Sequence, residues 1–232
     1  MGENMSDFKV GSVARNTLSR QVLEKFIELL MDGSLKTEDK LPSEMELMHM
    51  FDVSRPVLRE ALSSLETLEI ITRRPRGGTF INKKIGSNPF RAMLALSINN
   101  VPAVIEARMS LELGLVTLAA EKITEEQLAS LEETITAIEN TEDGDYGAID
   151  REFHRIIADS ANNPVVSGMI DSLLIAHQKT DSLIVIRERD ITVEHHRAIY
   201  EALKSKDPVE SFKQMYRHLQ YVRKKILANY NE

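Results

Sequence analysis

Apolar residues recur every three or four positions along most of this 232-residue chain, which is the spacing of amphipathic helices. The first such segment covers about residues 17–31, and Asp32-Gly33 ends it because glycine readily adopts a left-handed backbone. Beyond residue 101 the same spacing, with short connections, is typical of an antiparallel bundle. Helices are predicted there over residues 101–121, 124–140, 145–161, 165–188, 192–205 and 208–229.

Two short helices are predicted after the first one. Ser43 and Glu46 form a capping box, so a helix should begin at Ser43. Ser54 is suited to cap the next helix, with Pro56 in its first turn, where a missing N–H costs nothing. Only the tight turn at residues 51–53 separates the two helices, so together they form a helix-turn-helix.

A basic hairpin follows the helix-turn-helix. Short strands are predicted at Ile70–Thr72 and Thr79–Ile81, and the tip between them contains three arginines and two glycines. A helix-turn-helix followed by such a hairpin is a winged helix. This unit places one helix in the major groove of DNA while the wing contacts the neighbouring backbone or minor groove.

Several motifs in this region carry a resemblance to a known family. Leu-Pro-Ser-Glu begins at Leu41, Val-Ser-Arg-x-x-Leu-Arg-Glu-Ala-Leu begins at Val53, and Arg-Gly-Gly-Thr-Phe-Ile begins at Arg76. In this order and spacing they resemble the DNA-binding domain of GntR-family bacterial transcription regulators. Two arginines on one helix face would alone indicate a solvated surface, but the ordered set of motifs favours DNA binding.

The resemblance also implies which residues contact the operator. Arg55 and Arg59 lie four residues apart and so share one face of the second helix. Met45 stands where the family often has a DNA-contacting arginine, so that contact is either missing or replaced by a wing arginine. The expected DNA-binding residues of the helix and the wing are Ser54, Arg55, Arg59, Arg74, Arg76, Gly77 and Gly78.

Composition and charge divide the chain. Its length suggests one large or two modest domains, and the formal net charge is -7. Residues 1–85 hold 13 basic and 13 acidic residues, so the remainder, with 16 and 23, accounts for the whole negative charge. We therefore expect a winged helix over 1–84, a linker rich in Gly, Ser, Asn and Pro over 85–100, and an all-helical domain over 101–232.

Other features exclude whole classes of protein. The chain has no cysteine, which excludes disulfides, thiolate metal sites and cysteine redox sensing. No apolar run approaches the roughly 18 residues of a membrane span. The first residues lack the basic and apolar regions of a signal peptide. A cytoplasmic protein is expected.

Four polar residues of the predicted bundle lie on faces that are otherwise apolar. Asp150 and His154 are four residues apart and point the same way, while His196 and His218 lie on the apolar stripes of two later helices. Such a set suits a divalent transition metal. A hydrogen-bonded core histidine is the commoner reason for one imidazole on an apolar face, so the pattern alone leaves both interpretations open.

A second resemblance favours the metal. Asp-x-x-x-His at Asp150, His-x-Ala-Ile at His196 and Met-x-x-His-Leu at Met215 resemble the metal-binding form of the FCD ligand domain, found in the FadR branch of the GntR family. The resemblance implies that zinc, or else nickel or manganese, is bound by Asp150, His154, His196 and His218. His195 matches no ligand position and is expected at the edge of its helix.

Arg108 also lies on an apolar stripe, with Glu112 one turn later. The two residues could form a simple ion pair, or Arg108 could bind an effector carboxylate through two hydrogen bonds. The family pattern Glu-x-x-Arg-x-x-Leu-Glu is nearly intact, although Glu106 comes two rather than three positions before the arginine. In the family, the arginine and the metal together hold small organic acids.

These expectations combine into a fold and a function. The fold should be mostly α, with a three-helix winged helix-turn-helix before the bundle. We expect a regulator, not an enzyme, that binds an inverted-repeat operator as a homodimer and responds to a small carboxylate. The alternatives are a metal-dependent enzyme, or a dimerisation module with a structural metal, fused to the DNA-binding domain.

Overall fold

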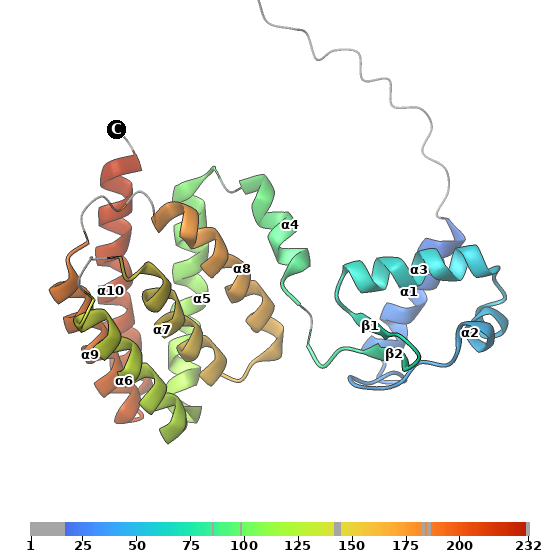
Figure 1. Cartoon of the computed structure of the whole chain (residues 1–232), viewed down its shortest axis with the longest axis horizontal. Helices are drawn as coiled ribbons and strands as arrows, with labels where there is room; N and C mark the ends of the chain where they lie inside the picture. The colour runs from blue at the N-terminus through green and yellow to red at the C-terminus, as the bar shows by residue number, and fades with distance from the viewer. Residues whose placement is uncertain are drawn as a thin grey trace, which may run out of the picture. The chain divides into compact units, whose positions relative to one another are not determined.

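The computed structural model describes residues 17–84, 86–97, 99–141, 145–181, 184 and 187–230. The chain divides into two compact units, Met1–Lys83 and Lys84–Glu232. Helices dominate both units (Figure 1). In the described residues, the two-stranded hairpin of the first unit forms the β-sheet. The predicted fold class, a winged helix-turn-helix followed by a helical bundle, is confirmed.

The first unit is the winged helix. It consists of α1 (Leu18–Met31), α2 (Glu44–Phe51), α3 (Arg55–Thr67), β1 (Ile71–Arg74) and β2 (Gly78–Ile81). Ser43 and Glu46 form the predicted capping box at the start of α2. Ser54 is the N-cap residue of α3, but its hydroxyl makes no capping hydrogen bond, contrary to the role expected for it. Pro56 supplies the fixed φ of the first turn instead.

A single apolar core holds these helices and the hairpin together. Its buried side chains include residues of α1, α2, α3 and both strands, among them Val22, Phe26, Leu47, Leu58, Leu62, Leu65, Ile71 and Ile81. The turn between α2 and α3 places Asp52 in the left-handed region, at a φ of 50°. This core fixes α3 against α1 and leaves the opposite face of α3 exposed.

The hairpin is antiparallel, and Arg74 pairs with Gly78 at its tip. Gly78 has a φ of 105°, and a Cβ there would lie 2.8 Å from Cε of Lys40. An isolated bridge joins Lys40 to Phe80, so the segment before α2 lies along the outside of β2. The backbone angle favours glycine at position 78, whereas the flexible Lys40 side chain could move away from a Cβ.

The second unit contains seven helices in the described chain. They are α4 (Asn88–Ser97), α5 (Val101–Lys122), α6 (Glu125–Glu139), α7 (Gly147–Ser160), α8 (Pro164–Asp181), α9 (Arg189–Lys204) and α10 (Pro208–Tyr230). The capping box of Thr124 and Gln127 begins α6 as predicted. The helix that we expected over residues 165–188 ends at Asp181. Residues 182–183 and 185–186, which belong to that predicted helix, lie outside the described residues.

The structure differs from the sequence-based expectation most clearly at residues 85–100. We expected a linker there, but Asn88–Ser97 forms α4, which packs against α8 and α5. Leu94 of α4 contacts the small apolar cluster of Val104, Leu173 and Ala176. None of the α4 side chains is fully buried, so the helix lies at the surface of the unit and covers α8 and α5 only in part.

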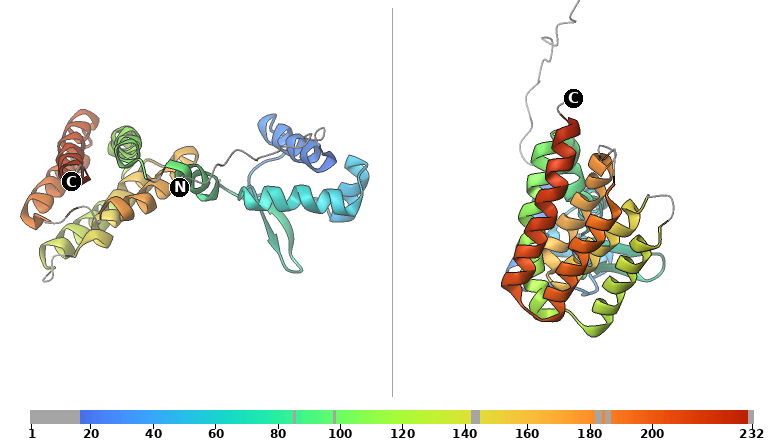
Figure 2. Two further views of the ribbon diagram at one scale, coloured as in Figure 1. Left: turned by 90° about the horizontal axis from the view of Figure 1, so that it is seen from above. Right: turned by 90° about the vertical axis from the view of Figure 1, so that its left-hand side faces the viewer.

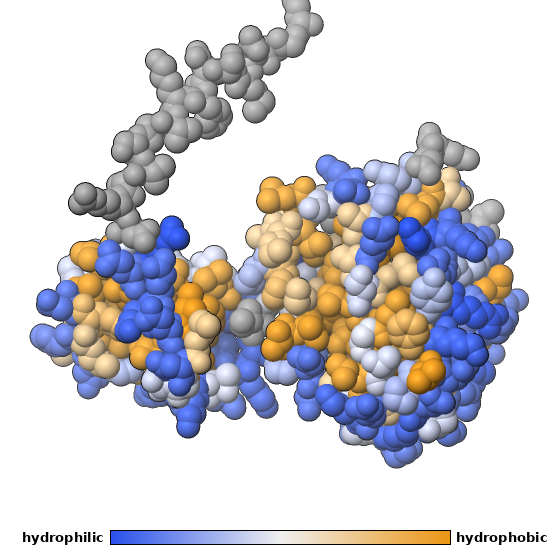
Figure 3. Space-filling view, turned by 180° about the vertical axis from the view of Figure 1, so that it is seen from behind, coloured by the Kyte–Doolittle hydropathy of each residue, from blue (hydrophilic) through white to orange (hydrophobic). Residues whose placement is uncertain are grey.

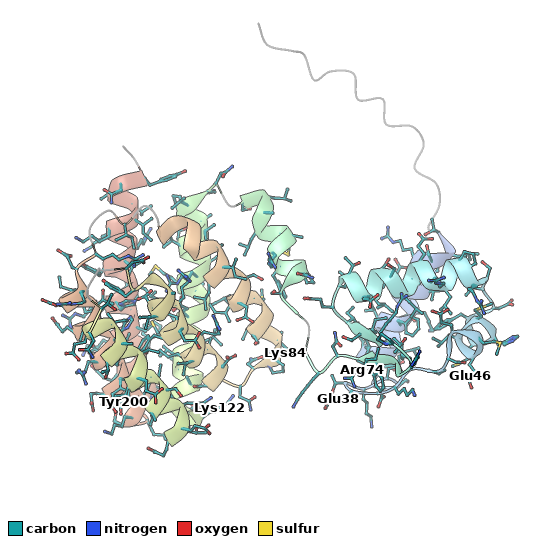
Figure 4. The ribbon with its side chains drawn as sticks, in the orientation of Figure 1. Glu38, Glu46, Arg74, Lys84, Lys122 and Tyr200 are labelled. Atoms are coloured by element: carbon teal, nitrogen blue, oxygen red, sulfur yellow. The ribbon has the colours of Figure 1, made fainter. Side chains whose placement is uncertain are left out.

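The long helices α5 and α10 run antiparallel and side by side in the second unit (Figure 2). Helix α9 packs beside α10, α6 covers α7 and α9, and α8 packs on α5 and α7. At one end of the unit, Nζ of Lys122 donates to the backbone carbonyl of Ala161, 2.8 Å away, and the Tyr200 hydroxyl donates to Glu132 (Figure 4).

None of the helices in the described part of the chain combines the length and the apolar character that crossing a membrane requires.

Candidate metal centre and DNA-binding surface

The second unit brings together the four polar residues that the sequence singled out. Asp150 and His154 come from α7, His196 comes from α9, and His218 comes from α10. Each residue is at most 8% exposed, and one possible ligand atom from each lies within 4.8 Å of the others. The i, i+4 spacing on α7 explains why Asp150 and His154 face the same point.

Distances and ring contacts define this cluster. Nε2 of His154 lies 3.1 Å from Nε2 of His218, and Nε2 of His196 lies 3.3 Å from Oδ1 of Asp150. The Phe153 ring stacks on the His196 ring with a centroid distance of 3.9 Å and an interplanar angle of 4°. Tight apolar packing therefore sets the plane of at least one imidazole.

The hydrogen bonding inside the cluster is incomplete. Nδ1 of His196 and Nδ1 of His218 have no partner, and Nε2 of His196 meets Asp150 only in the 3.3 Å contact, which lacks good hydrogen-bond geometry. A buried polar group without a partner costs about 1–3 kcal/mol. Three imidazoles and one carboxylate are the nitrogen and oxygen donors that zinc and similar divalent metals prefer, so the residues present fit such an ion.

The protonation states also suit metal binding. Burial lowers the pKa of His196 and holds the pKa of His218 well below its usual value. For Asp150, burial acts to raise the pKa, but the contact with His196 and the nearby rings lower it well below the usual range. At neutral pH this gives neutral imidazoles at positions 196 and 218 beside a charged carboxylate, which are the forms that bind a metal.

Arg108 and Glu112 adjoin the cluster from α5. Nε of Arg108 donates to Oε1 of Glu112, and the other carboxylate oxygen contacts Nδ1 of His154. Burial would raise the pKa of Glu112, but the Arg108 charge and the contact with His154 lower it to about 2. The structure thus contains the ion pair between Arg108 and Glu112. Nη2 of the same guanidinium has no hydrogen-bond partner.

One cavity reaches the cluster and another reaches Arg108. One has a volume of about 30 Å³, reaches Asp150 and His218, and has Arg187, Glu188 and Lys225 among its lining residues. The other, of about 10 Å³, places Arg108 among the apolar side chains of Val104, Ile105, Met109, Leu219, Val222 and Ile226. Both cavities are large enough only for water, so a larger ligand requires side chains to move.

His195 does not lie at a helix edge as expected. It is buried, and its ring contacts those of Tyr221 and His218, with centroid distances of 5.3 and 5.8 Å. Burial, together with the charge of Arg217, lowers the pKa of His195. The sequence offered no sign of this, because Tyr221 lies on another helix.

The expected DNA-binding residues lie on the exposed side of the winged helix. Ser54, Arg55 and Arg59 are exposed on α3, and the Ser54 hydroxyl is not used in capping. The wing arginines separate into different environments. Arg73 turns toward Glu66, with 3.4 Å between Nε and Oε2, whereas the guanidinium of Arg74 lies 4.7 Å from the Phe80 ring centroid (Figure 4).

The tip of the wing exposes the remaining arginine. Arg76 is exposed and has a left-handed backbone with a φ of 59°, followed by Gly77 and Gly78. A Cβ at Gly77 would lie 3.0 Å from Cβ of Arg74, so the turn leaves little room for a side chain. The structure thus places Arg76 at the end of the hairpin and Arg74 along its side.

Two family models match the chain. Residues 18–81 match the model described as "Bacterial regulatory proteins, gntR family", and residues 103–221 match the model described as "FCD domain". The two matches fall on the winged helix and on the helical unit respectively.

Individual proteins are similar over nearly the whole length. The HTH-type transcriptional regulator YcbG of Bacillus subtilis (strain 168), described as uncharacterized, is 60% identical over all of both chains. LutR, an HTH-type transcriptional regulator of the same strain, is 30% identical, with 88% of this chain and 98% of LutR covered. The solved structure of Streptococcus agalactiae GntR has a TM-score of 0.62 and 28% identity, covering 89% of this chain and 99% of that one.

Proposed function

This chain belongs to the gntR family of bacterial regulatory proteins and carries an FCD domain, and we propose on that basis that a divalent metal and a small carboxylate control its binding to DNA. It is a DNA-binding transcription regulator, as are the families and relatives that it matches. The proposed metal ligands are Asp150, His154, His196 and His218, and zinc is the first candidate, followed by nickel and manganese. We expect the protein to act in the cytoplasm.

One observation carries the metal proposal. Four buried donors from three helices converge, and ring nitrogens of His196 and His218 have no hydrogen-bond partner. A core of merely structural histidines would be expected to satisfy those nitrogens. A bound metal would supply a Lewis acid with a coordination position for a ligand oxygen.

The charges around the cluster support an anionic effector. Arg108 and Glu112 neutralise each other in direct contact, and the carboxylate of Asp150 lies beside the neutral rings of His196 and His218. A divalent cation would bring two positive charges to this one carboxylate, and an anionic ligand would balance the excess. Nη2 of Arg108, buried and without a partner, is the nearby donor that such a carboxylate would use.

The metal proposal is tested by native mass spectrometry of the protein after incubation with Zn²⁺. One ion per chain is expected for the parent and for His49→Ala, which removes an exposed histidine of α2. His196→Ala should lose the ion, because it removes a buried donor of the cluster. A parent protein that binds no ion, or a His196→Ala protein that binds it as before, contradicts the proposal.

The effector proposal is tested with Arg108→Lys. Lysine keeps the positive charge beside Glu112 but lacks the planar fork that binds a carboxylate through two hydrogen bonds. A panel of small organic acids, measured by DNA-binding titration with Zn²⁺ present, should shift the operator affinity of the parent but not that of the variant. If the variant responds like the parent, Arg108 does not bind the effector and serves only in its ion pair with Glu112.

We also propose that the protein is a homodimer that binds an inverted repeat. Large apolar side chains are exposed on α4 and α8, including Leu96, which is 92% exposed, and Met93, Val165 and Ile175. Apolar surface is visible on the helical unit among hydrophilic residues (Figure 3). A monomer in sedimentation that binds one half-site as tightly as the full site would contradict this.

The two alternatives predict different measurements. A metal-dependent enzyme would turn over candidate acids, which the family and the relatives do not suggest. A purely structural metal would need a closed site, whereas a cavity reaches Asp150 and His218 here.

A further inference from the structure

Glu112 joins two residues for which separate roles were expected. It lies on α5, is 3% exposed, and uses one carboxylate oxygen for Nε of Arg108 and the other for Nδ1 of His154. The sequence indicated Glu112 only as a partner of Arg108, because the contact with His154 crosses from α5 to α7 and has no local signature.

The contact with Glu112 determines where the proton of His154 lies. A neutral imidazole carries one N–H, and a carboxylate accepts hydrogen bonds but does not donate them. When the His154 ring is neutral, its proton is therefore expected on Nδ1, the nitrogen that contacts the carboxylate. That leaves the lone pair on Nε2, the nitrogen that faces His218 at 3.1 Å.

Arg108 makes it possible for Glu112 to be charged in this place. A buried carboxylate without a compensating charge would take up a proton or be expelled, since its burial is costly. The guanidinium is 4% exposed, and its Nε donates to the carboxylate. Arg108, Glu112 and His154 thus form one continuous chain of polar contacts.

We propose that Glu112 is a positioning residue for the metal centre. It fixes the tautomer of His154 and the direction of its ring, so that Nε2 points into the cluster with a free lone pair. Carboxylates that accept from metal-binding histidines act in this way, and removing them typically lowers metal affinity by about 10- to 100-fold. This inference rests on the metal site proposed above and adds a residue to it.

The test compares Glu112→Gln with Glu106→Gln. Both substitutions remove one charge from α5 and keep the size of the side chain, but Glu106 is exposed and pairs with Arg223 at 3.0 Å. In Zn²⁺ competition titrations against a chelating dye, Glu112→Gln should bind roughly 10- to 100-fold more weakly than the parent. Glu106→Gln should match the parent.

A second measurement needs no variant and covers the case in which Glu112→Gln does not fold. ¹⁵N chemical shifts of the imidazoles in the metal-free parent report the tautomer directly, and His154 should carry its proton on Nδ1. A proton on Nε2 of His154 would overturn the inference, and so would an unchanged zinc affinity in a folded Glu112→Gln protein.

The two proposals fail in different ways. A parent protein that binds no Zn²⁺ refutes the metal site itself. A parent that binds Zn²⁺ while Glu112→Gln binds it equally well leaves the site intact and refutes only the role of Glu112. A purely structural Glu112 would change the unfolding temperature of the metal-free protein and leave the zinc affinity of the folded variant unchanged.

Discussion

The two units hold their arginines in opposite environments. Arg55, Arg59 and Arg76 of the winged helix are exposed, whereas Arg108 of the helical unit is buried beside Glu112. An exposed charge contributes little to stability before a partner arrives, while a buried charge must be balanced inside the fold. The proposed binding residues of the first unit are therefore separable from its folding, and those of the second unit are part of the core.

The same substitution in each unit gives the largest contrast. Arg108→Met leaves the Glu112 carboxylate buried without its cation and should lower the free energy of unfolding by about 3–5 kcal/mol. Arg55→Met removes an exposed charge and should change the free energy of unfolding by less than about 0.5 kcal/mol. Urea unfolding followed by circular dichroism measures both, and equal effects would contradict the contrast.

Removing the metal should also act on only one unit. With free Zn²⁺ at about 100 times its dissociation constant, binding stabilises the site by about 2.7 kcal/mol, and a chelator removes that contribution. Calorimetry with and without chelator should shift the unfolding of the helical unit only. An equal shift in the winged helix would mean that the two units unfold together.

In the winged helix the main effect of a substitution should be on DNA binding. Arg59→Ala should cost about 1–3 kcal/mol of operator affinity if the side chain contacts a guanine edge, with the loss depending on the operator sequence. Arg20→Ala, at an exposed arginine of α1 paired with Glu24, is the matched control. A loss that is uniform over unrelated DNA would identify Arg59 as a phosphate contact.

The smallest expected effect is on a helix cap. Ser43→Ala removes the hydroxyl that accepts from the backbone N–H of Glu46, and it should cost about 1 kcal/mol of stability in the winged helix. Ser54→Ala should cost much less, because the Ser54 hydroxyl makes no capping hydrogen bond. If Ser54→Ala instead weakens operator binding without changing stability, its hydroxyl is a DNA contact.

Local patterns predicted the elements of this fold well. Apolar spacing and caps indicated the described helices of both units apart from α4, and the hairpin lies within two residues of its expected position. The convergence of Asp150, His154, His196 and His218 was also predictable, because each residue interrupts an apolar stripe and such stripes face one another in a bundle.

What the sequence did not show depends on contacts between helices. The Gly, Ser, Asn and Pro residues at 86–89 indicated a linker, whereas helix α4 is held by its contacts with α5 and α8. Glu112 contacts His154 and His195 contacts Tyr221 across helix boundaries. Periodicity predicts which face of a helix is buried, but it does not predict which residue of a neighbouring helix a side chain meets.

The contact between His154 and His218 has a consequence for kinetics. The two residues are 64 positions apart, so closing the intervening chain carries an entropic cost that local contacts avoid. Contacts that form late in folding mainly set the rate of unfolding. If this contact forms late, an ion bound between the two residues would slow the unfolding of the helical unit without speeding its folding. The ion would then be released only when the helical unit opens, at the same slow rate.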